Sequence, residues 1–292
     1  MADLGQASAV PNVGMVPSAE KGPQRQFAGR AQAVRTSVMA QIESIYRYPV
    51  KGFSPERLPR VTLTKGATLP LDRVYAVENG PSKFDSQKPQ YFPKIRFLEL
   101  MRNARLAALR TALDEETQVM TIRYENREAA RGDLRTPEGR AAIERFLAEY
   151  VAEDLRGPPK VLHAPGHSFS DVAKKVVSII NLASVAELES AMGAPVDPLR
   201  FRGNLHVSGW PAWHEFTLLG SEIIVGAKAR LKVVKRIVRC TATEVDPQTA
   251  IRDVPIPRIL MDTYDHADCG IYAEVIEGGA IAPGDIIEAT ST

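Results

Sequence analysis

EFTLLGSEIIVG (residues 215–226) and ARLKVVKRIVRC (residues 229–240) are two short apolar runs that follow each other closely, with Gly226 between them. Their length, their Ile and Val content and the intervening glycine are typical of β-strands. FRGNLHVSG (residues 201–209) and GIYAEVIEGGAIAPGDII (residues 270–287) predict further short strands on either side. Because this part of the chain has few long helical patterns, its second half is predicted to be an antiparallel β-barrel.

The first half of the chain also predicts mostly strands, in residues 41–50, 60–69 and 72–80, and a hairpin in residues 108–126 that turns at residues 114–117. Two segments have helical spacing instead. One begins at Thr136, and the other runs over residues 184–193, with Ser184 as its cap and Gly193 as its end. The predicted fold class is therefore mainly β with some α (α+β), a β-barrel plus an N-terminal β-rich domain.

Three parts are expected along the chain. Residues 1–38 are rich in Ala, Gly, Pro, Ser and Gln and lack a sustained period, so we expect a disordered extension, or a misassigned one if Met39 is the true start. Residues 39–157 would form the β-rich domain. The chain-breaking GPPK at residues 157–160 marks the boundary to the barrel domain, residues 158–292.

Composition excludes several classes of protein. The 37 basic and 35 acidic residues give a net charge of +2, which does not indicate a nucleic-acid partner. No apolar run approaches the roughly 18 residues of a membrane span. We expect a soluble, cytoplasmic protein. Two cysteines are too few for a disulfide scaffold, although one bridge between Cys240 and Cys269 stays open.

Cys240 is the first candidate for chemistry. Arg236, Arg239 and Lys235 lie close to it in the sequence, and neighbouring cations favour the thiolate, the form that binds metals or attacks electrophiles. The alternative is a small buried apolar side chain.

Two other segments carry candidate anion-binding residues. If PLRFRGN (residues 198–204) were a strand, Arg200, Arg202 and Asn204 would share a face that suits a phosphate or carboxylate. The alternative is a solvated face with surface ion pairs. Lys51 lies in a glycine-ended turn, and Asp72 with Arg73 could be a surface pair. The five histidines show no metal-ligand spacing.

Seven motifs occur in the order of a known family: IYRYPVKG, LDRVYAV, FSDVAKKVVSIINLASVAELE, PLRFRGNLHVSG, WHEFTLLG, RCTATEVDP and GIYAEVIEGGAIAPGD. In these motifs the chain resembles the MOSC family, named for the C-terminal domain of molybdenum cofactor sulfurases. The first half resembles the β-rich N-terminal domain of the branch that includes the mitochondrial amidoxime reducing component and its bacterial relatives. The resemblance covers about residues 41–289.

The resemblance implies a site for the molybdenum cofactor (Mo-molybdopterin). Cys240 would ligate the metal and would be the catalytic residue. The cofactor-binding residues would be Lys51, Arg73, Asp171, Arg202 and Asn204. VAKK, after Asp171, departs from the family pattern, and Lys174 or Lys175 could supply phosphate contacts instead. Cys269 has no counterpart among the ligands and is expected to pack in the core.

The implied activity is that of a molybdenum-dependent oxidoreductase, which reduces small N-hydroxylated compounds by breaking the N–O bond. The sequence has no haem, flavin or Fe–S motif and no nicotinamide fingerprint, so the electrons would come from a separate reductase or carrier protein. Two alternatives stay open. Cys240 could hold a persulfide in a sulfur-carrier or cofactor-handling protein, or the chain could be an anion-binding barrel with an inert Cys240.

Overall fold

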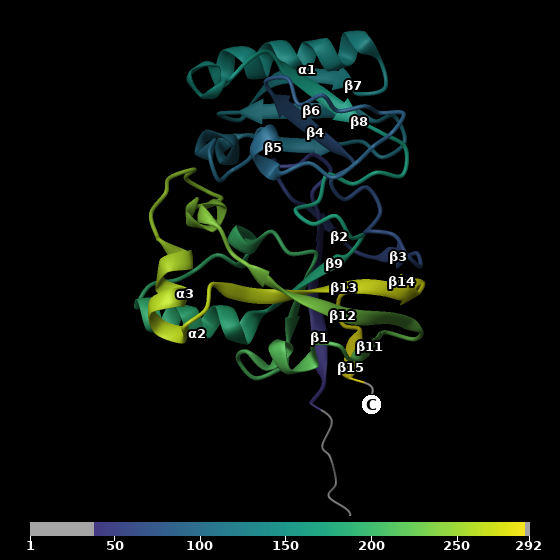
Figure 1. Cartoon of the computed structure of the whole chain (residues 1–292), viewed down its shortest axis with the longest axis vertical. Coiled ribbons are helices and arrows are strands. Elements are labelled where there is room, and N and C mark those ends of the chain that lie inside the picture. Colours follow the sequence, from purple (N-terminus) through teal and green to yellow (C-terminus); the bar gives the residue numbers. More distant parts are fainter. Residues whose placement is uncertain (1–37, 290–292) are drawn as a thin grey trace, which may run out of the picture. The chain divides into compact units, whose positions relative to one another are not determined.

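Seven strands close a barrel in the computed structural model of this chain, which describes residues 38–289 (Figure 1). The order around the barrel is β10, β9, β13, β12, β11, β15 and β1, and β1 pairs in turn with β10. The bounds are β1 (Ala40–Arg47), β9 (Val177–Asn181), β10 (Leu205–Ser208), β11 (Glu222–Val225), β12 (Ala229–Val238), β13 (Asp268–Glu277) and β15 (Ile286–Ala289). Neighbouring strands are antiparallel except β9 and β10, which are parallel. The predicted fold class, mainly β with some α, is confirmed.

Alternation along the strands fills the barrel. In β12, Ala229, Leu231 and Val233 are buried, while Arg230 and Lys232 between them are exposed. Successive side chains of a strand point to opposite faces, so the apolar set enters the barrel and the cations remain outside. The barrel core continues through the other strands with Ile42, Ile45, Val177, Ile179, Leu205, Val207, Ile223, Ile271 and Ile287.

A second group of elements is formed mainly by the first half of the chain. β4 (Tyr75–Asn79) pairs with β8 (Pro159–His163), and β5 (Arg110–Leu113), β6 (Val119–Tyr124) and β7 (Arg127–Asp133) form an antiparallel sheet. α1 (Pro137–Tyr150) has contacts with β7 and β8. The predicted hairpin and the predicted cap are both confirmed: Asp114 accepts from the turn amide of Thr117, and Thr136 accepts from the amide of Gly139 at 3.0 Å.

Strand pairing crosses the predicted boundary at Gly157 in both directions. β1 belongs to the first segment but is part of the barrel, and β2 (Glu56–Leu58) pairs with β1. β3 (Val61–Leu63) pairs with β14 (Gly279–Ile281) near the end of the chain. Conversely, β8 lies beyond the boundary but pairs with β4. The division into residues 39–157 and 158–292 stays a prediction, and the extension over residues 1–38 lies outside the described residues except for Val38.

Short helices cover the barrel strands. α2 (Leu182–Met192) ends at Gly193 in the left-handed conformation, as predicted. Its cap is Asn181, however, and the prediction of Ser184 was wrong, because the Ser184 hydroxyl donates to the buried Glu215 carboxylate. α3 (Ile256–Tyr264) was not predicted. It packs Ile256 and Leu260 against Cys269.

Six 3-10 helices complete the described elements: η1 (Lys94–Arg96), η2 (Ala104–Ala108), η3 (Ala152–Asp154), η4 (Pro198–Phe201), η5 (His214–Leu218) and η6 (Thr241–Glu244). Within residues 38–289, no helix combines the length and the apolar character that crossing a bilayer requires.

Candidate functional site

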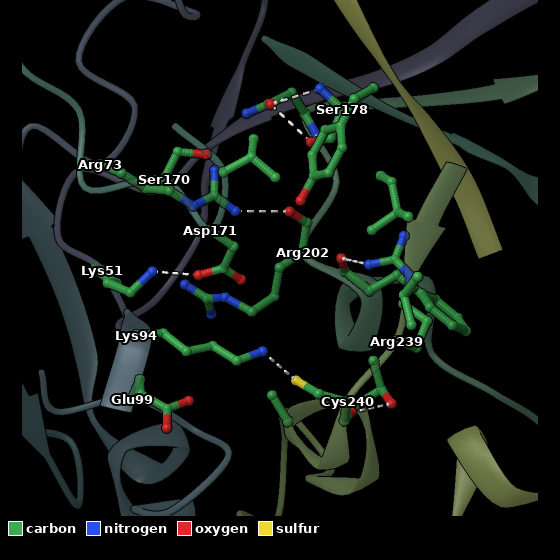
Figure 2. A pocket seen from close by; sticks show the side chains of 18 of the residues that line it. Lys51, Arg73, Lys94, Glu99, Ser170, Asp171, Ser178, Arg202, Arg239 and Cys240 are labelled. Carbon is green, nitrogen blue, oxygen red and sulfur yellow. Dashed lines mark hydrogen bonds and ion pairs between the residues drawn. The ribbon is translucent and has the colours of Figure 1, made fainter. Parts of the chain in front are cut away.

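One pocket brings all six predicted site residues together (Figure 2). Its wall includes Lys51, Arg73, Asp171, Arg202, Asn204 and Cys240. The cavity volume is about 210 Å³, several times the roughly 30 Å³ that one water occupies in the liquid, so the pocket can hold part of a larger ligand.

The pocket is strongly cationic. Eight of its lining residues are Lys or Arg, and three are Asp or Glu. The lining cations are Lys51, Arg73, Lys94, Arg200, Arg202, Lys235, Arg236 and Arg239, and the acids are Asp72, Glu99 and Asp171. Such an excess of positive charge in a concave site attracts anions.

Cys240 lies where the chain leaves β12, and it is the residue before η6. Its thiol is free and half-buried, and Lys94 Nζ donates a hydrogen bond to its Sγ at 2.9 Å. The Cys240 carbonyl accepts from the Thr243 amide at 3.0 Å and from the Thr243 hydroxyl at 2.9 Å, and these bonds fix the turn that presents the sulfur. Cys240 therefore offers a soft sulfur donor beside an ammonium.

Lys51 and Asp171 form an ion pair in the pocket wall. Lys51 Nζ also donates to the Phe169 carbonyl at 2.9 Å. Burial lowers the pKa of Lys51, although Asp171 opposes that shift. Enclosure disfavours the charge of Asp171, but the Lys51 ammonium, followed by Arg73 and Lys94, outweighs it and holds the pKa of this carboxyl below its usual range.

Arg73 is held firmly in place. Its guanidinium pairs with the buried Asp72 and donates to the Arg202 carbonyl at 3.0 Å. Asp72 also accepts from the Tyr48 amide at 2.8 Å, so Asp72 and Arg73 do not form the surface pair that the sequence suggested. Burial opposes the charge of Arg73, but Asp72 and Asp171 raise its pKa further above its usual value.

The guanidinium groups of Arg202 and Arg73 both lie over the ring of Tyr48, but Arg202 has a hydrogen-bond donor that no described residue uses. The guanidinium carbons of Arg202 and Arg73 are 4.2 Å and 5.0 Å from the centroid of the buried Tyr48 ring. Arg202 Nη2 is buried without a hydrogen-bond partner among the described residues. Burial lowers the pKa of Arg202 to about 10, and the neighbouring charge of Arg73 contributes. A guanidinium in this situation gains stability from an added anion.

Asn204 lines the pocket, but its amide has structural partners. Its Oδ1 accepts from the Ser178 amide at 3.0 Å and from the Ser178 hydroxyl at 2.8 Å, and its Nδ2 donates to the Tyr46 carbonyl at 3.1 Å. These bonds join β1 and β9 to the residue just before β10. They leave one Nδ2 hydrogen for a ligand.

The predicted strand face of Arg200, Arg202 and Asn204 was wrong. Residues 198–201 form η4, and Arg202 after it is left-handed with φ 51°. Arg200 turns to the segment after Cys240, where Nη2 pairs with Asp246 at 2.8 Å and with Asp253 at 2.7 Å. Arg200 thus anchors the loop that follows the cysteine.

Asp246 organises the loop after Cys240, since its Oδ1 accepts from the amides of Gln248 at 2.8 Å and Thr249 at 2.7 Å. Two expectations from the sequence concern other residues around the site. Lys174 and Lys175 do not line the pocket, and Lys174 pairs with Glu274 at 2.6 Å instead.

Cys269 is a free thiol that is fully buried, and burial raises its pKa to about 12. Its burial confirms the packing role, and its free state removes the disulfide alternative.

Sequence reasoning missed Lys94 and Glu99. Lys94 begins η1, and Glu99 follows it in a turn. Neither belongs to a motif. Lys94 reaches Cys240, and Glu99 reaches the pocket, only because the folded chain brings distant segments together. By contrast, η4 had a signal, because Asp197 followed by Pro198 is a typical helix start, and Asp197 accepts from the Leu199 amide at 2.9 Å.

The fold and site define a class: a mainly β protein in which a closed barrel supports one cationic pocket with a free thiol. Two family models match this chain, the MOSC N-terminal beta barrel domain over residues 39–154 and the MOSC domain over residues 164–288. The chain belongs to the MOSC family, as its motifs predicted.

The chain is similar to mitochondrial amidoxime reducing component 2 of Bos taurus, with 31% identity over 121 residues, which cover 37% of this chain and 35% of the relative. The match thus spans about a third of the length of this curated relative. Among solved structures, the YuaD protein of Bacillus subtilis has a TM-score of 0.43 and 17% identity, covering 87% of this chain and 97% of YuaD. YiiM from Geobacillus stearothermophilus has a TM-score of 0.32 and 20% identity, covering 39% of this chain and 54% of YiiM.

Proposed function

We propose that this chain is a molybdenum-cofactor-dependent oxidoreductase that reduces N-hydroxylated compounds with electrons from a separate donor. The observation that carries the proposal is the meeting of the Cys240 thiol with eight Lys and Arg side chains in one pocket. MOSC domains are associated with binding of the molybdenum cofactor. The similar bovine protein is named an amidoxime reducing component, which supports N–O bond reduction as the reaction class.

The residues of the pocket fit such a cofactor. Within residues 38–289, no cluster of three or more His, Cys, Asp or Glu side chains could hold a bare metal ion. A single thiolate among cations suits a metal that arrives already bound by sulfur in an anionic chelate. The unpaired Nη2 of Arg202 is the group that an anionic ligand would satisfy.

The proposed roles follow from the contacts of each residue. Cys240 would ligate the metal, and Lys51, Arg73 and Arg202 would hold the phosphate and the pterin. Asp171 would keep Lys51 charged and directed into the pocket. When bound, the cofactor supplies the two-electron redox chemistry.

A separate reductase or carrier protein is part of the proposal, because the sequence has only two cysteines and no flavin or nicotinamide fingerprint. A cytoplasmic location is also proposed, since both cysteines are free thiols, as is usual in a reducing compartment. Cell fractionation tests the location.

The decisive experiment compares three proteins made in a host that synthesises the molybdenum cofactor: wild type, Cys240→Ser and Cys269→Ala. We expect stoichiometric molybdenum and an oxidised pterin from wild type and from Cys269→Ala, and a loss of molybdenum from Cys240→Ser. Wild type should reduce a hydroxylamine or an amidoxime with an artificial reductant, but not with NAD(P)H alone.

Other results would overturn the proposal. Sulfane sulfur on Cys240 without molybdenum would identify a sulfur carrier. Wild type without molybdenum or sulfane sulfur, and with any activity unchanged in Cys240→Ser, would identify an anion-binding barrel in which this thiol is inert. An unchanged molybdenum content in Cys240→Ser would remove Cys240 as the metal ligand. Turnover with NAD(P)H and no partner protein would remove the separate electron donor.

A further inference from the structure

Glu99 is a buried carboxyl group in the wall of the same pocket. The residue is 5% exposed, and it lies beside Lys94, on the side of the pocket opposite Arg239 (Figure 2). It sits at the start of a turn in which its carbonyl accepts from the amides of Arg102 and Asn103. Its backbone amide donates to the Asn103 side chain at 3.1 Å. The backbone therefore fixes where this carboxyl group lies.

The two oxygens of Glu99 differ. Oε2 accepts from the Met101 amide at 2.8 Å. Oε1 is buried and has no hydrogen-bond partner among the described residues. An unpaired oxygen in a buried ionised carboxylate is costly, whereas the protonated group carries a hydrogen that a ligand can receive.

Charged groups face Glu99 from three segments. Lys94 of η1 and Lys51 of the turn after β1 favour its ionised form, and Asp171 disfavours it. Burial is the largest influence, and with Asp171 it raises the pKa of Glu99 above its usual value. The Met101 hydrogen bond and the two ammonium groups oppose this shift but do not cancel it.

We infer that Glu99 is the proton donor of this pocket: its buried carboxylic acid delivers a proton to the oxygen that leaves nitrogen. The inference rests on the proposed function. The proposed reaction needs a proton donor. The other described acids of the pocket, Asp72 and Asp171, are paired with Arg73 and Lys51, which leaves Glu99 for this role.

An N-hydroxylated substrate R–NH–OH takes two electrons and two protons and gives R–NH₂ and water. The N–O bond breaks, and the separate donor supplies both electrons. The Glu99 O–H gives one proton to the departing oxygen, directly or through one water, and solvent gives the other. Solvent then restores the proton of Glu99.

The first test is the pH dependence of kcat in Glu99→Gln, which keeps the size of the side chain and an acceptor for the Met101 amide. Because the neutral acid is the active form, wild-type kcat should fall as the pH rises through the Glu99 pKa. In Glu99→Gln we expect kcat to be about 100-fold lower and this fall to disappear. Glu99→Asp should retain the fall, and the exposed Glu116→Gln should behave as wild type.

A second readout needs no cofactor. In infrared spectra of the cofactor-free protein recorded at increasing pH, wild type and Glu116→Gln should keep a protonated carboxyl band to a higher pH than ordinary carboxyl groups do, and Glu99→Gln should lack that band. If wild type contains molybdenum and reduces the substrate while Glu99→Gln keeps the rate and the pH profile, the role of Glu99 is wrong and the proposed function stands. If wild type itself binds no molybdenum, the proposed function fails, and the proton-donor role of Glu99 in that reaction fails with it. The infrared band then shows only whether Glu99 is a protonated carboxyl group.

Discussion

Lys94 and Cys240 are 146 residues apart in the chain, yet Lys94 Nζ donates a hydrogen bond to Cys240 Sγ at 2.9 Å. Burial opposes the charge of Lys94, but this bond to the sulfur, with the charge of Asp171, raises the pKa of the ammonium. Lys94 therefore stays charged beside the sulfur that the proposed function assigns to the metal.

Replacing Lys94 should make Cys240 less reactive. An ammonium beside sulfur stabilises the thiolate, the nucleophilic form. In the cofactor-free protein, Lys94→Met should slow alkylation of Cys240 by iodoacetamide about tenfold, the size of a charge-assisted hydrogen bond of ~1.5 kcal/mol. Mass spectrometry of the modified peptide measures the rate. Lys94→Arg retains the cation and should react nearly as wild type, and equal rates in all three proteins would show that the contact has no effect.

Arg202 is expected to be needed for retention of the cofactor. Its Nη2 lacks a partner within residues 38–289, so an anionic ligand gains a charge-assisted hydrogen bond there. Arg202→Gln should weaken cofactor retention about 10- to 100-fold, as loss of a ~1.5–3 kcal/mol contact predicts. The oxidised pterin that remains after dilution and gel filtration measures this, with the exposed Arg57→Gln as the control. Full retention in Arg202→Gln would contradict the assignment.

The Lys51–Asp171 pair should make stability depend on pH. In Asp171→Asn the buried ammonium of Lys51 loses its charged partner and keeps the Phe169 carbonyl. We expect the free energy of unfolding to fall by about 1 kcal/mol at pH 7, since a carboxylate side chain that is 46% exposed is partly screened by solvent.

The direction of the pH effect follows from the lowered pKa of Asp171. A depressed carboxyl stabilises the folded state above its unfolded pKa of about 3.9, and this contribution disappears as the pH falls through the folded pKa. The difference between wild type and Asp171→Asn in urea unfolding should therefore shrink in acid. The exposed Glu153→Gln should show no difference at either pH, and a gap for Asp171→Asn that widens in acid would refute the pairing.

Arg200 should be a major contributor to stability. It is buried and binds Asp246 and Asp253, so its removal leaves two carboxylates without their guanidinium. Arg200→Leu should lower the free energy of unfolding by about 3 kcal/mol. Arg258 pairs with Asp262 on the exposed surface of α3, and Arg258→Gln should cost at most about 0.5 kcal/mol. Chemical denaturation of both variants measures the contrast, and similar losses would show that burial of the pair does not matter.

Local patterns predicted the elements whose structure is decided locally. The strand predicted in residues 229–240 and the Thr136 cap of α1 depend on neighbours in the sequence, and β12 and the cap confirm both. Ser184 shows the limit of such rules. It has the residue type of a helix cap, but the buried Glu215 carboxylate takes its hydroxyl, so Asn181 serves instead.

The site was predictable where a motif marked it. Lys51, Arg73, Asp171, Arg202, Asn204 and Cys240 all line one pocket, although their roles stay predictions. Lys94 and Glu99 lie outside every motif and reach the pocket only because the chain folds back on itself. The orientation of Arg200 depended on two acids about fifty residues away, at a separation that spacing rules do not describe.

The pairing of β1 with β15 also governs how the barrel can be completed during synthesis. Ala40 lies opposite Ile287, so the first and the last described strands are neighbours. A growing polypeptide keeps one edge of β11 and one edge at the start of β1 unpaired until the residues of β15 have left the ribosome, because β15 pairs with both strands. Final ring closure is therefore a late event, and deleting β15 would leave those edges open to association between molecules.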